Sequence, residues 1–165
     1  MIFFDTCLWI ELCCTTTPTT PEQQRRTQKA SEIISEAKRN AEEIVTCKEQ
    51  LIEIISAIQK IKMKEYNRCC RESSSPKVGQ LKDYRSTEHF SSAQLLCKAA
   101  INDIYTMASE KDIGAYDINN LLSNIHLVDI NDYLYYQYCI KESIDFYTFD
   151  QDFSNLASSP KIHIL

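Results

Sequence analysis

The feature of this chain that most constrains its fold is the alternation of short apolar runs with longer segments whose apolar residues recur at helical spacing. The short runs predict five buried strands, at residues 2–4, 44–46, 126–130, 145–149 and 161–165. The periodic segments predict five helices, at residues 22–40, 51–66, 90–107, 118–122 and 131–140. Strands separated by helices favour an α/β fold with a central, mainly parallel sheet of about five short strands flanked by helices.

Length and composition are those of one folded domain. The chain has 165 residues, of which 44% are hydrophobic and 25% are charged, and these values exclude a disordered or coiled-coil protein. We therefore expect a single domain over residues 1–165. Two glycines and four prolines are few, so most residues should lie in regular elements, with surface loops at residues 15–21 and 67–79. Since there is no run of about 18 apolar residues, we expect no membrane span.

The N-terminus and the cysteines bear on the cellular compartment. Asp5 and Glu11 interrupt the apolar start of the chain, and the first cation is Arg25. The basic region of a signal peptide is therefore missing, and a cytoplasmic location is expected. The chain has eight cysteines, but no two have the CxxC spacing of a redox or zinc motif. We expect reduced thiols rather than disulfides.

Positive charge is concentrated in one stretch of a chain whose net charge is −5. Residues 60–85 contain eight Lys or Arg against three acids, a net charge of +5. A solvated helix end and loop would explain such a run, and so would a surface that binds phosphates. The candidate contacts to a nucleic-acid backbone are Lys60, Lys62, Lys64, Arg68 and Arg71.

Acidic residues follow three of the predicted strands. They are Asp5, Asp129, Asp132, Asp150 and Asp152. Glu49 and Glu53 lie one turn apart in the helix after the second strand. Because the carboxyl ends of parallel strands meet at one edge of a sheet, these carboxylates should converge there. Acids at strand ends also serve as helix N-caps. If they do converge, their repulsion would favour a hard divalent ion, Mg²⁺ or Mn²⁺.

Four short blocks of the sequence resemble the motifs of PIN-domain nucleases, in the order that the family has them. Residues 2–6, Ile-Phe-Phe-Asp-Thr, resemble the opening motif, and residues 44–46 with 51–54 resemble the second block. Residues 131–135 are similar to the third block, in which an Asp opens a helix. Residues 146–153 are similar to the fourth and most specific block, a strand that ends in Thr-x-Asp-x-Asp-Phe. Together the blocks span almost the whole chain.

The resemblance implies a three-layer PIN-like fold and a metal-dependent ribonuclease that hydrolyses single-stranded or looped RNA. The catalytic acids that it implies are Asp5, Glu53, Asp132 and Asp150, with Glu49 as a rival for Glu53. The Mg²⁺ or Mn²⁺ ligands would be Asp5, Asp132, Asp150 and Asp152.

Three further residues near these motifs carry expectations of their own. Thr6 and Thr148 either steady the metal ligands by hydrogen bonds or only cap the strand ends. Cys7 stands where the family commonly has Asn. We therefore expect that a hydrogen bond supporting the site is absent.

The resemblance also implies partners. PIN-domain proteins often act as the toxin of a toxin–antitoxin pair and usually form homodimers, so an antitoxin and a second copy of the chain join RNA as candidate partners, with no membrane. The basic helix end and loop at residues 60–90 is longer than in compact toxins. Two alternatives stay open: a PIN-like module that binds RNA or protein without cutting, and a metal-dependent phosphatase on a similar sheet.

Overall fold

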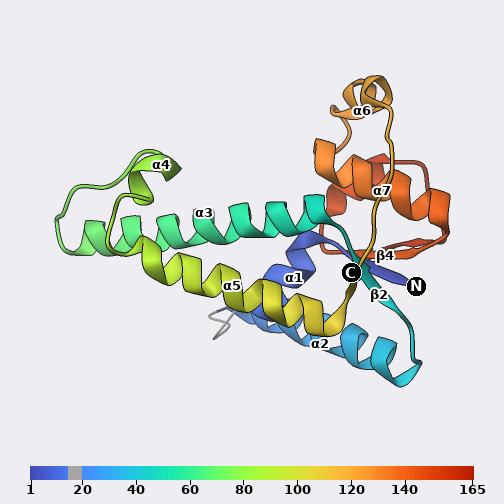
Figure 1. Ribbon diagram of the computed structural model, residues 1–165, viewed down its shortest axis with the longest axis horizontal. Helices are drawn as coiled ribbons and strands as arrows, with labels where there is room; N and C mark the ends of the chain where they lie inside the picture. The colour runs from blue at the N-terminus through green and yellow to red at the C-terminus, as the bar shows by residue number, and fades with distance from the viewer. Residues whose placement is uncertain (15–19) are drawn as a thin grey trace.

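The computed structural model of the chain describes residues 1–14 and 20–165 (Figure 1). Residues 15–19, which hold most of the loop predicted at residues 15–21, lie outside the described residues. The described residues form a sheet of five parallel strands in the order β3-β2-β1-β4-β5. The strands are β1 (Ile2–Phe4), β2 (Ile44–Thr46), β3 (Ser109–Glu110), β4 (Asp145–Thr148) and β5 (Ile162–Ile164). The prediction of an α/β fold with a parallel central sheet is confirmed.

One of the five predicted strands is wrong. Residues 125–128 form a turn in which the Leu127 N–H donates to the Asn124 carbonyl at 2.9 Å, and Asp129 is the N-cap of the next helix. Val128 is buried and anchors this turn, which explains why the run looks like a strand in the sequence. The strand that the sequence analysis missed is β3, whose two exposed polar residues carry no strand pattern.

The helices agree with their predicted positions more closely than the strands do. They are α1 (Thr6–Cys13), α2 (Pro21–Arg39), α3 (Lys48–Glu72), α4 (Leu81–Tyr84), α5 (Phe90–Met107), α6 (Ile118–Asn124) and α7 (Ile130–Glu142), with a 3-10 turn η1 at Gln151–Asn155. The sequence analysis did not predict α1 or α4. In addition, α3 continues to Glu72, so the first part of the loop predicted at residues 67–79 is helical.

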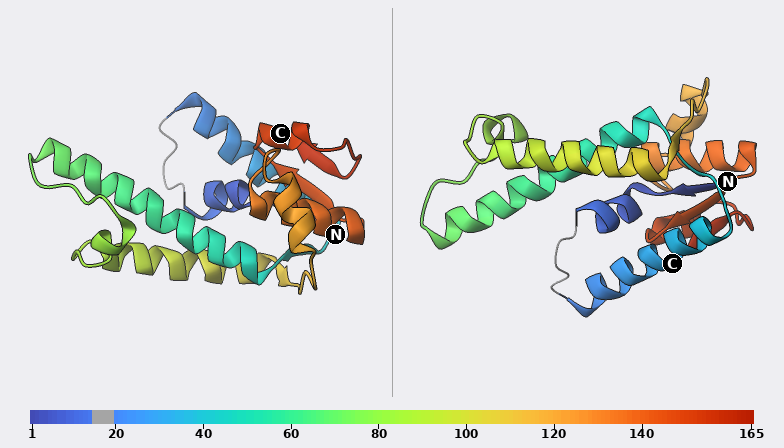
Figure 2. Two further views of the ribbon diagram at one scale, coloured as in Figure 1. Left: turned by 90° about the horizontal axis from the view of Figure 1, so that it is seen from above. Right: turned by 60° about the horizontal axis from the view of Figure 1, so that its bottom comes forward.

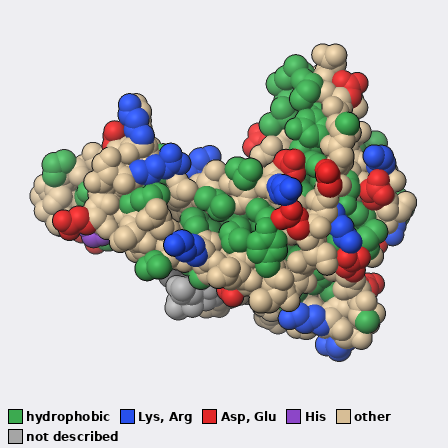
Figure 3. Space-filling view, in the orientation of Figure 1, with side chains coloured by type: hydrophobic (Ala, Val, Ile, Leu, Met, Phe, Trp, Pro, Cys, Tyr) green, Lys and Arg blue, Asp and Glu red, His purple; other side chains and the backbone are tan. Residues whose placement is uncertain are grey.

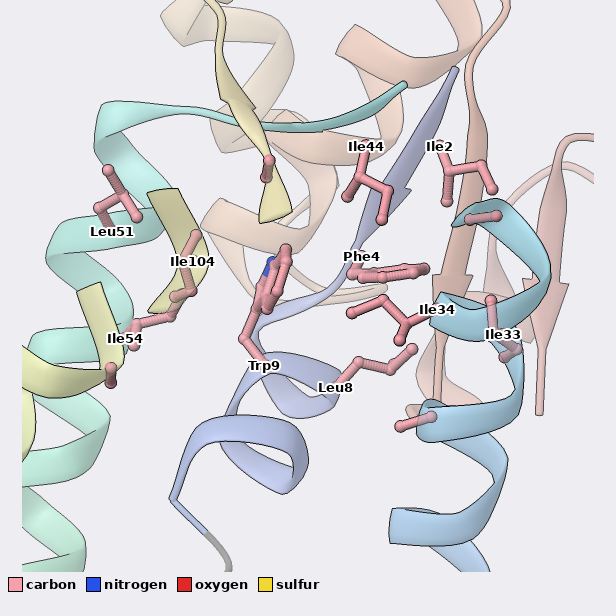
Figure 4. Packing of buried hydrophobic residues seen from close by; sticks show 14 of the residues in the cluster. Ile2, Phe4, Leu8, Trp9, Ile33, Ile34, Ile44, Leu51, Ile54 and Ile104 are labelled. Carbon is pink, nitrogen blue, oxygen red and sulfur yellow. The ribbon is translucent and has the colours of Figure 1, made fainter. Parts of the chain in front are cut away.

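Two apolar clusters cover the two faces of the sheet, which makes the fold three-layered. Side chains of β1 alternate between them, because Ile2 and Phe4 belong to one cluster and Phe3 to the other. The first cluster is built with α1, α2, α3 and α5, and there Phe4 lies edge-on to Trp9 with ring centroids 5.4 Å apart (Figure 4). The second is built with α6, α7 and η1. β1 is therefore the centre of both cores.

The outer parts of α3 and α5 project beyond the sheet as an arm, with α4 at its tip (Figures 1 and 2). We define the arm as α3 from residue 60 onward, α4, and the part of α5 that packs against them. Aromatic rings close its tip, since the Tyr66 ring lies 5.7 Å from that of Tyr84 and 5.1 Å from that of His89. The arm carries most of the basic stretch at residues 60–85.

Two expectations about the chain as a whole can be compared with the structure. All eight cysteines are free, as expected of reduced thiols. Within residues 1–14 and 20–165, no helix combines the length and the apolar character needed to cross a bilayer.

The α3 helix offers a direct test of which face holds the core. Ile54 is fully buried, whereas Ile52, two residues earlier, is 65% exposed. Ile54→Ala should lower the free energy of unfolding by about 3 kcal/mol, because it removes buried methyl groups and leaves a cavity. The matched change Ile52→Ala should stay within about 0.5 kcal/mol of the parent protein. Urea unfolding followed by circular dichroism measures both, and equal losses would contradict the packing described here.

Candidate active site

Asp5 is the first residue after β1 and is almost fully buried, with 4% of its surface exposed. The Thr148 hydroxyl, at the end of the neighbouring strand β4, donates a hydrogen bond of 2.5 Å to its Oδ2. The Cys7 thiol donates to the same oxygen at 3.1 Å and accepts from the Phe149 N–H at 3.3 Å. Cys7 therefore supplies the supporting hydrogen bond that we expected to be absent, and that expectation is wrong.

Glu53 reaches the same place from the first turns of α3. The fully buried Gln50 fixes these turns, because its Nε2 donates to the Phe4 carbonyl at 2.6 Å and its Oε1 accepts from the Thr46 hydroxyl at 2.8 Å. A polar side chain at a core position thus ties α3 to β1 and β2. Nothing in the sequence pattern distinguishes it from a solvent-facing residue.

Two side chains of α7 hold the Glu53 carboxylate. Its Oε2 accepts from the Tyr135 hydroxyl at 2.8 Å and from the Asn131 Nδ2 at 3.1 Å. The rival Glu49 lies one turn earlier, beside Lys48 and Glu110 at the β3 edge of the sheet. The geometry thus brings Glu53, and not Glu49, to the other acids.

Asp132, in the first turn of α7, completes the approach of three acids. Its pKa is raised to about 8, mainly by burial and in addition by the negative charges of Asp5, Glu53 and Asp150. Burial also raises the pKa of Asp5, and the charge of Asp150 adds to this, although the hydrogen bonds from Thr148 and Cys7 oppose it. The three carboxyl groups therefore resist ionising together.

Burial likewise raises the pKa of Glu53, and the charge of Asp5 contributes in the same direction. The hydrogen bonds from Tyr135 and Asn131 lower it in part. Burial and the charge of Glu53 raise the pKa of the Tyr135 hydroxyl, so Tyr135 remains a hydrogen-bond donor to this carboxylate. Tyr135 and Asn131 are supporting residues that the sequence analysis did not assign to the site.

Asp150 and Asp152 play different parts. Asp150 lies two residues after Thr148, whose Oγ1 accepts its N–H at 2.8 Å, and its charge acts on both Asp5 and Asp132. Its own Oδ1 accepts the Asp152 N–H at 2.9 Å and so caps η1. Asp152 is exposed. Asp129, the N-cap of α7, is among the acids that raise the pKa of Asp132.

Within residues 1–14 and 20–165, the acid cluster has no neutralising cation. In the described part of the chain, no Lys, Arg or His lies within ion-pair distance of Asp5, Glu53, Asp132 or Asp150. Several buried carboxylates without a counter-charge are costly, and a bound divalent ion would remove most of that cost. An all-oxygen donor set is the one that Mg²⁺ and Mn²⁺ prefer. By charge and by donor chemistry, these residues fit such an ion.

The side chains are not collected into a finished coordination shell. Among the described residues, no three acidic, His or Cys side chains are close enough to ligate one ion together. Asp5 and Glu53 point instead at protein donors. The Thr6 hydroxyl is buried beside these acids and has no partner at hydrogen-bond geometry among the described residues. It nevertheless lies near enough to Glu53 to lower the pKa of that carboxyl. Rotation of a few carboxylates would therefore be needed to close a shell.

The predicted nucleic-acid contacts lie outside the acid cluster, on the arm. Lys60, Lys64, Arg68 and Arg71 are exposed on α3 beyond Glu53. Lys62 differs from them, because it is partly buried and its Nζ lies 2.7 Å from the Glu65 carboxylate. Figure 3 shows the surface notched between the arm and the side formed by α6 and α7, with Lys and Arg side chains along the upper edge of the arm.

The site thus combines acids from four elements that are distant in the chain: the ends of β1 and β4 and the first turns of α3 and α7. A family model described as PIN domain matches residues 2–158. Comparison with curated proteins gave no match, and comparison with solved structures gave none either. PIN domains are generally nucleases that act on nucleic acid and use divalent metal ions. Because the match covers nearly the whole chain and the central sheet is parallel as expected, this chain belongs to the PIN domain family.

Proposed function

We propose that this chain is a metal-dependent endoribonuclease that hydrolyses phosphodiester bonds of single-stranded or looped RNA. The observation that carries the proposal is the meeting of Asp5, Glu53, Asp132 and Asp150 without a neutralising cation. The choice of RNA follows the resemblance of the four sequence blocks to PIN-domain ribonucleases.

The roles of the residues follow from their positions. Asp5, Asp132 and Asp150 would hold a Mg²⁺ or Mn²⁺ ion, directly or through water, and Glu53 would hold a second ion or orient a metal-bound water. Such an ion lowers the pKa of bound water and stabilises the charge that develops on the phosphate. Thr148 and Cys7 hold Oδ2 of Asp5, and Tyr135 and Asn131 hold Oε2 of Glu53, so each carboxylate would turn about a held oxygen when it binds the ion. Asp152 stays a candidate auxiliary ligand from the exposed side.

A binding module that does not cut RNA is the second candidate. It is favoured by one observation, the hydrogen bonds that already occupy Asp5 and Glu53. The toxin role, an antitoxin partner and a homodimer remain predictions from the resemblance alone. The single domain over residues 1–165 remains a prediction from length and composition.

The two glutamates of α3 provide the matched test of the proposal. Glu53→Gln should lower Mn²⁺-dependent cleavage of a single-stranded RNA by about 100-fold or more, because it removes one charge and weakens the site. Glu49→Gln makes the same chemical change one turn away and should leave cleavage within about twofold. Calorimetric Mn²⁺ titration and a fluorogenic RNA assay measure both variants.

The same assays separate the alternatives. A protein that binds Mn²⁺ and RNA without cutting would be a binding module, and hydrolysis of a small phosphoester in preference to RNA would indicate a phosphatase. If Glu49→Gln abolishes cleavage and Glu53→Gln does not, the site described here is misassigned.

A further inference from the structure

Four of the five predicted nucleic-acid contacts share one face of α3 with Glu53. Lys60, Lys64, Arg68 and Arg71 follow Glu53 by 7, 11, 15 and 18 residues. At 3.6 residues per turn these spacings keep all four within about 60° of the Glu53 direction. At 1.5 Å per residue, the row extends from about 10 Å to about 27 Å beyond Glu53 along the helix. We call Lys60, Lys64, Arg68 and Arg71 the basic stripe.

The cations of the stripe are exposed. In the described part of the chain, none of its four side chains makes an ion pair. Glu65 and Glu72 stand at i−3 and i+4 from Arg68, about 60° and 40° around the helix, but Glu65 pairs with Lys62 instead. Lys60, Lys64 and Arg68 follow one another at i,i+4 spacing, where like charges repel. A bound polyanion would relieve this repulsion.

The stripe starts at the acid cluster. The Glu53 carboxylate faces α7, because it accepts hydrogen bonds from Asn131 and Tyr135 there. The same face of α3 continues outward as the upper edge of the arm, on one side of the notch (Figures 1 and 3). On the opposite side of the notch lie α6 and its exposed apolar residues Ile118 and Leu122. The stripe thus offers a row of positive charge to a ligand along the arm side of the notch.

We propose that the basic stripe binds the phosphates of a single-stranded RNA flank on one side of the cut, so that the arm extends the substrate site in one direction. The inference rests on the proposed ribonuclease function for its choice of polyanion. One straight row of cations about 6 Å apart fits successive phosphates of a single backbone, whereas a duplex would present two backbones. The arm therefore selects substrates with an unpaired flank.

A binding experiment tests the stripe without metal or cleavage. The probe is a fluorescent single-stranded RNA in EDTA, and its affinity is measured by polarisation over a range of salt concentrations. The two variants each lose two lysines and one arginine, so their net charges match. The stripe variant is Lys60→Gln, Lys64→Gln and Arg68→Gln. The control on α2 is Lys29→Gln, Lys38→Gln and Arg39→Gln, all exposed.

In the stripe variant, the slope of log K against log salt should be shallower by about 2. If the variant and the parent protein bind equally at 1 M salt, the variant should then bind about 100-fold more weakly than the parent at 0.1 M salt. The α2 control should bind within about twofold of the parent protein. Equal losses in the stripe variant and the α2 control would overturn the inference, as would equal affinity for a duplex of the same length.

A second experiment tests direction. With cleavable RNAs of increasing flank length, kcat/KM should rise over about four or five nucleotides on one side of the cut only, the number that spans about 27 Å at about 6 Å per phosphate. The stripe variant should lose this dependence. A symmetric dependence would contradict the inference while leaving the ribonuclease proposal intact. Salt-dependent binding through the stripe without any cleavage would instead contradict the ribonuclease proposal alone.

Discussion

Asp132→Asn should make the protein more stable and inactive at the same time. Burial of Asp132, together with the charges of four other acids, holds its pKa at about 8, so its ionised form disfavours folding. Asparagine keeps the shape without the charge and should raise the free energy of unfolding by ~2 kcal/mol in metal-free buffer. The loss of a favourable charge at the N-terminus of α7 is smaller and does not reverse the sign. RNA cleavage should fall by about 100-fold or more.

Urea unfolding in EDTA and the Mn²⁺-dependent RNA assay measure the two effects on the same preparation. The control is Asp103→Asn, an exposed residue in α5, which should change neither quantity appreciably. A stability loss in Asp132→Asn would show that Asp132 is held by a favourable partner rather than by repulsive neighbours. Full activity in that variant would remove it from the proposed ligands.

Metal-free protein should lose stability as the pH rises toward 8, and Mn²⁺ should reverse this. The folded pKa of Asp132 is about 8 against an ordinary value of 3.8, so between these values the folded state binds more protons than the unfolded state. The free energy of unfolding therefore falls with rising pH across that window. Asp145 is the opposite case. Burial raises its pKa, but hydrogen bonds from Lys161 and His163 lower it by more. Asp145 therefore makes stability rise with pH, but only in more acidic solution.

Thermal unfolding from pH 5.5 to 8, with and without Mn²⁺, measures this dependence. At a Mn²⁺ concentration 100 times its Kd, the ion should add about 2.7 kcal/mol, or roughly 5–10 °C in Tm. In Asp132→Asn the pH dependence should flatten and the gain from Mn²⁺ should shrink. A pH profile that rises toward 8 without metal would contradict the repulsive cluster.

Two of the strands that the sequence predicts correctly, β1 and β2, have side chains buried on both faces. The apolar residues of β1, such as Phe3 and Phe4, leave little alternative to a central strand. β3 could not be found this way, because its pairing with β2 places two exposed polar residues at an edge. Residues 126–130 gave the opposite error, a predicted strand where the structure has a turn. One buried valine, Val128, gives this turn the same short apolar pattern as a strand. The count of five strands was right although one of its members was not.

Most of the candidate site could be read from acids at the ends of elements, because parallel strands and the helices that follow them bring their ends to one edge. Spacing could not decide between Glu49 and Glu53, which lie one turn apart. The decision comes from Tyr135 and Asn131, whose reach across to α3 is a property of helix packing. The split within the basic residues depends likewise on Lys62 finding Glu65 on the far side of the helix.

The hydrogen bond between Thr148 and Asp5 joins residues separated by 143 positions. During synthesis at about 5–20 residues per second, Asp5 waits roughly 7–30 s before Thr148 is even made. Until then β1 lacks its neighbour β4. Asp5, Glu53 and Asp132 also lack the fourth acid of the cluster, Asp150. Under the proposed function, a nascent chain would lack the complete acid cluster until synthesis has passed Asp150, so the topology itself would delay cleavage of RNA.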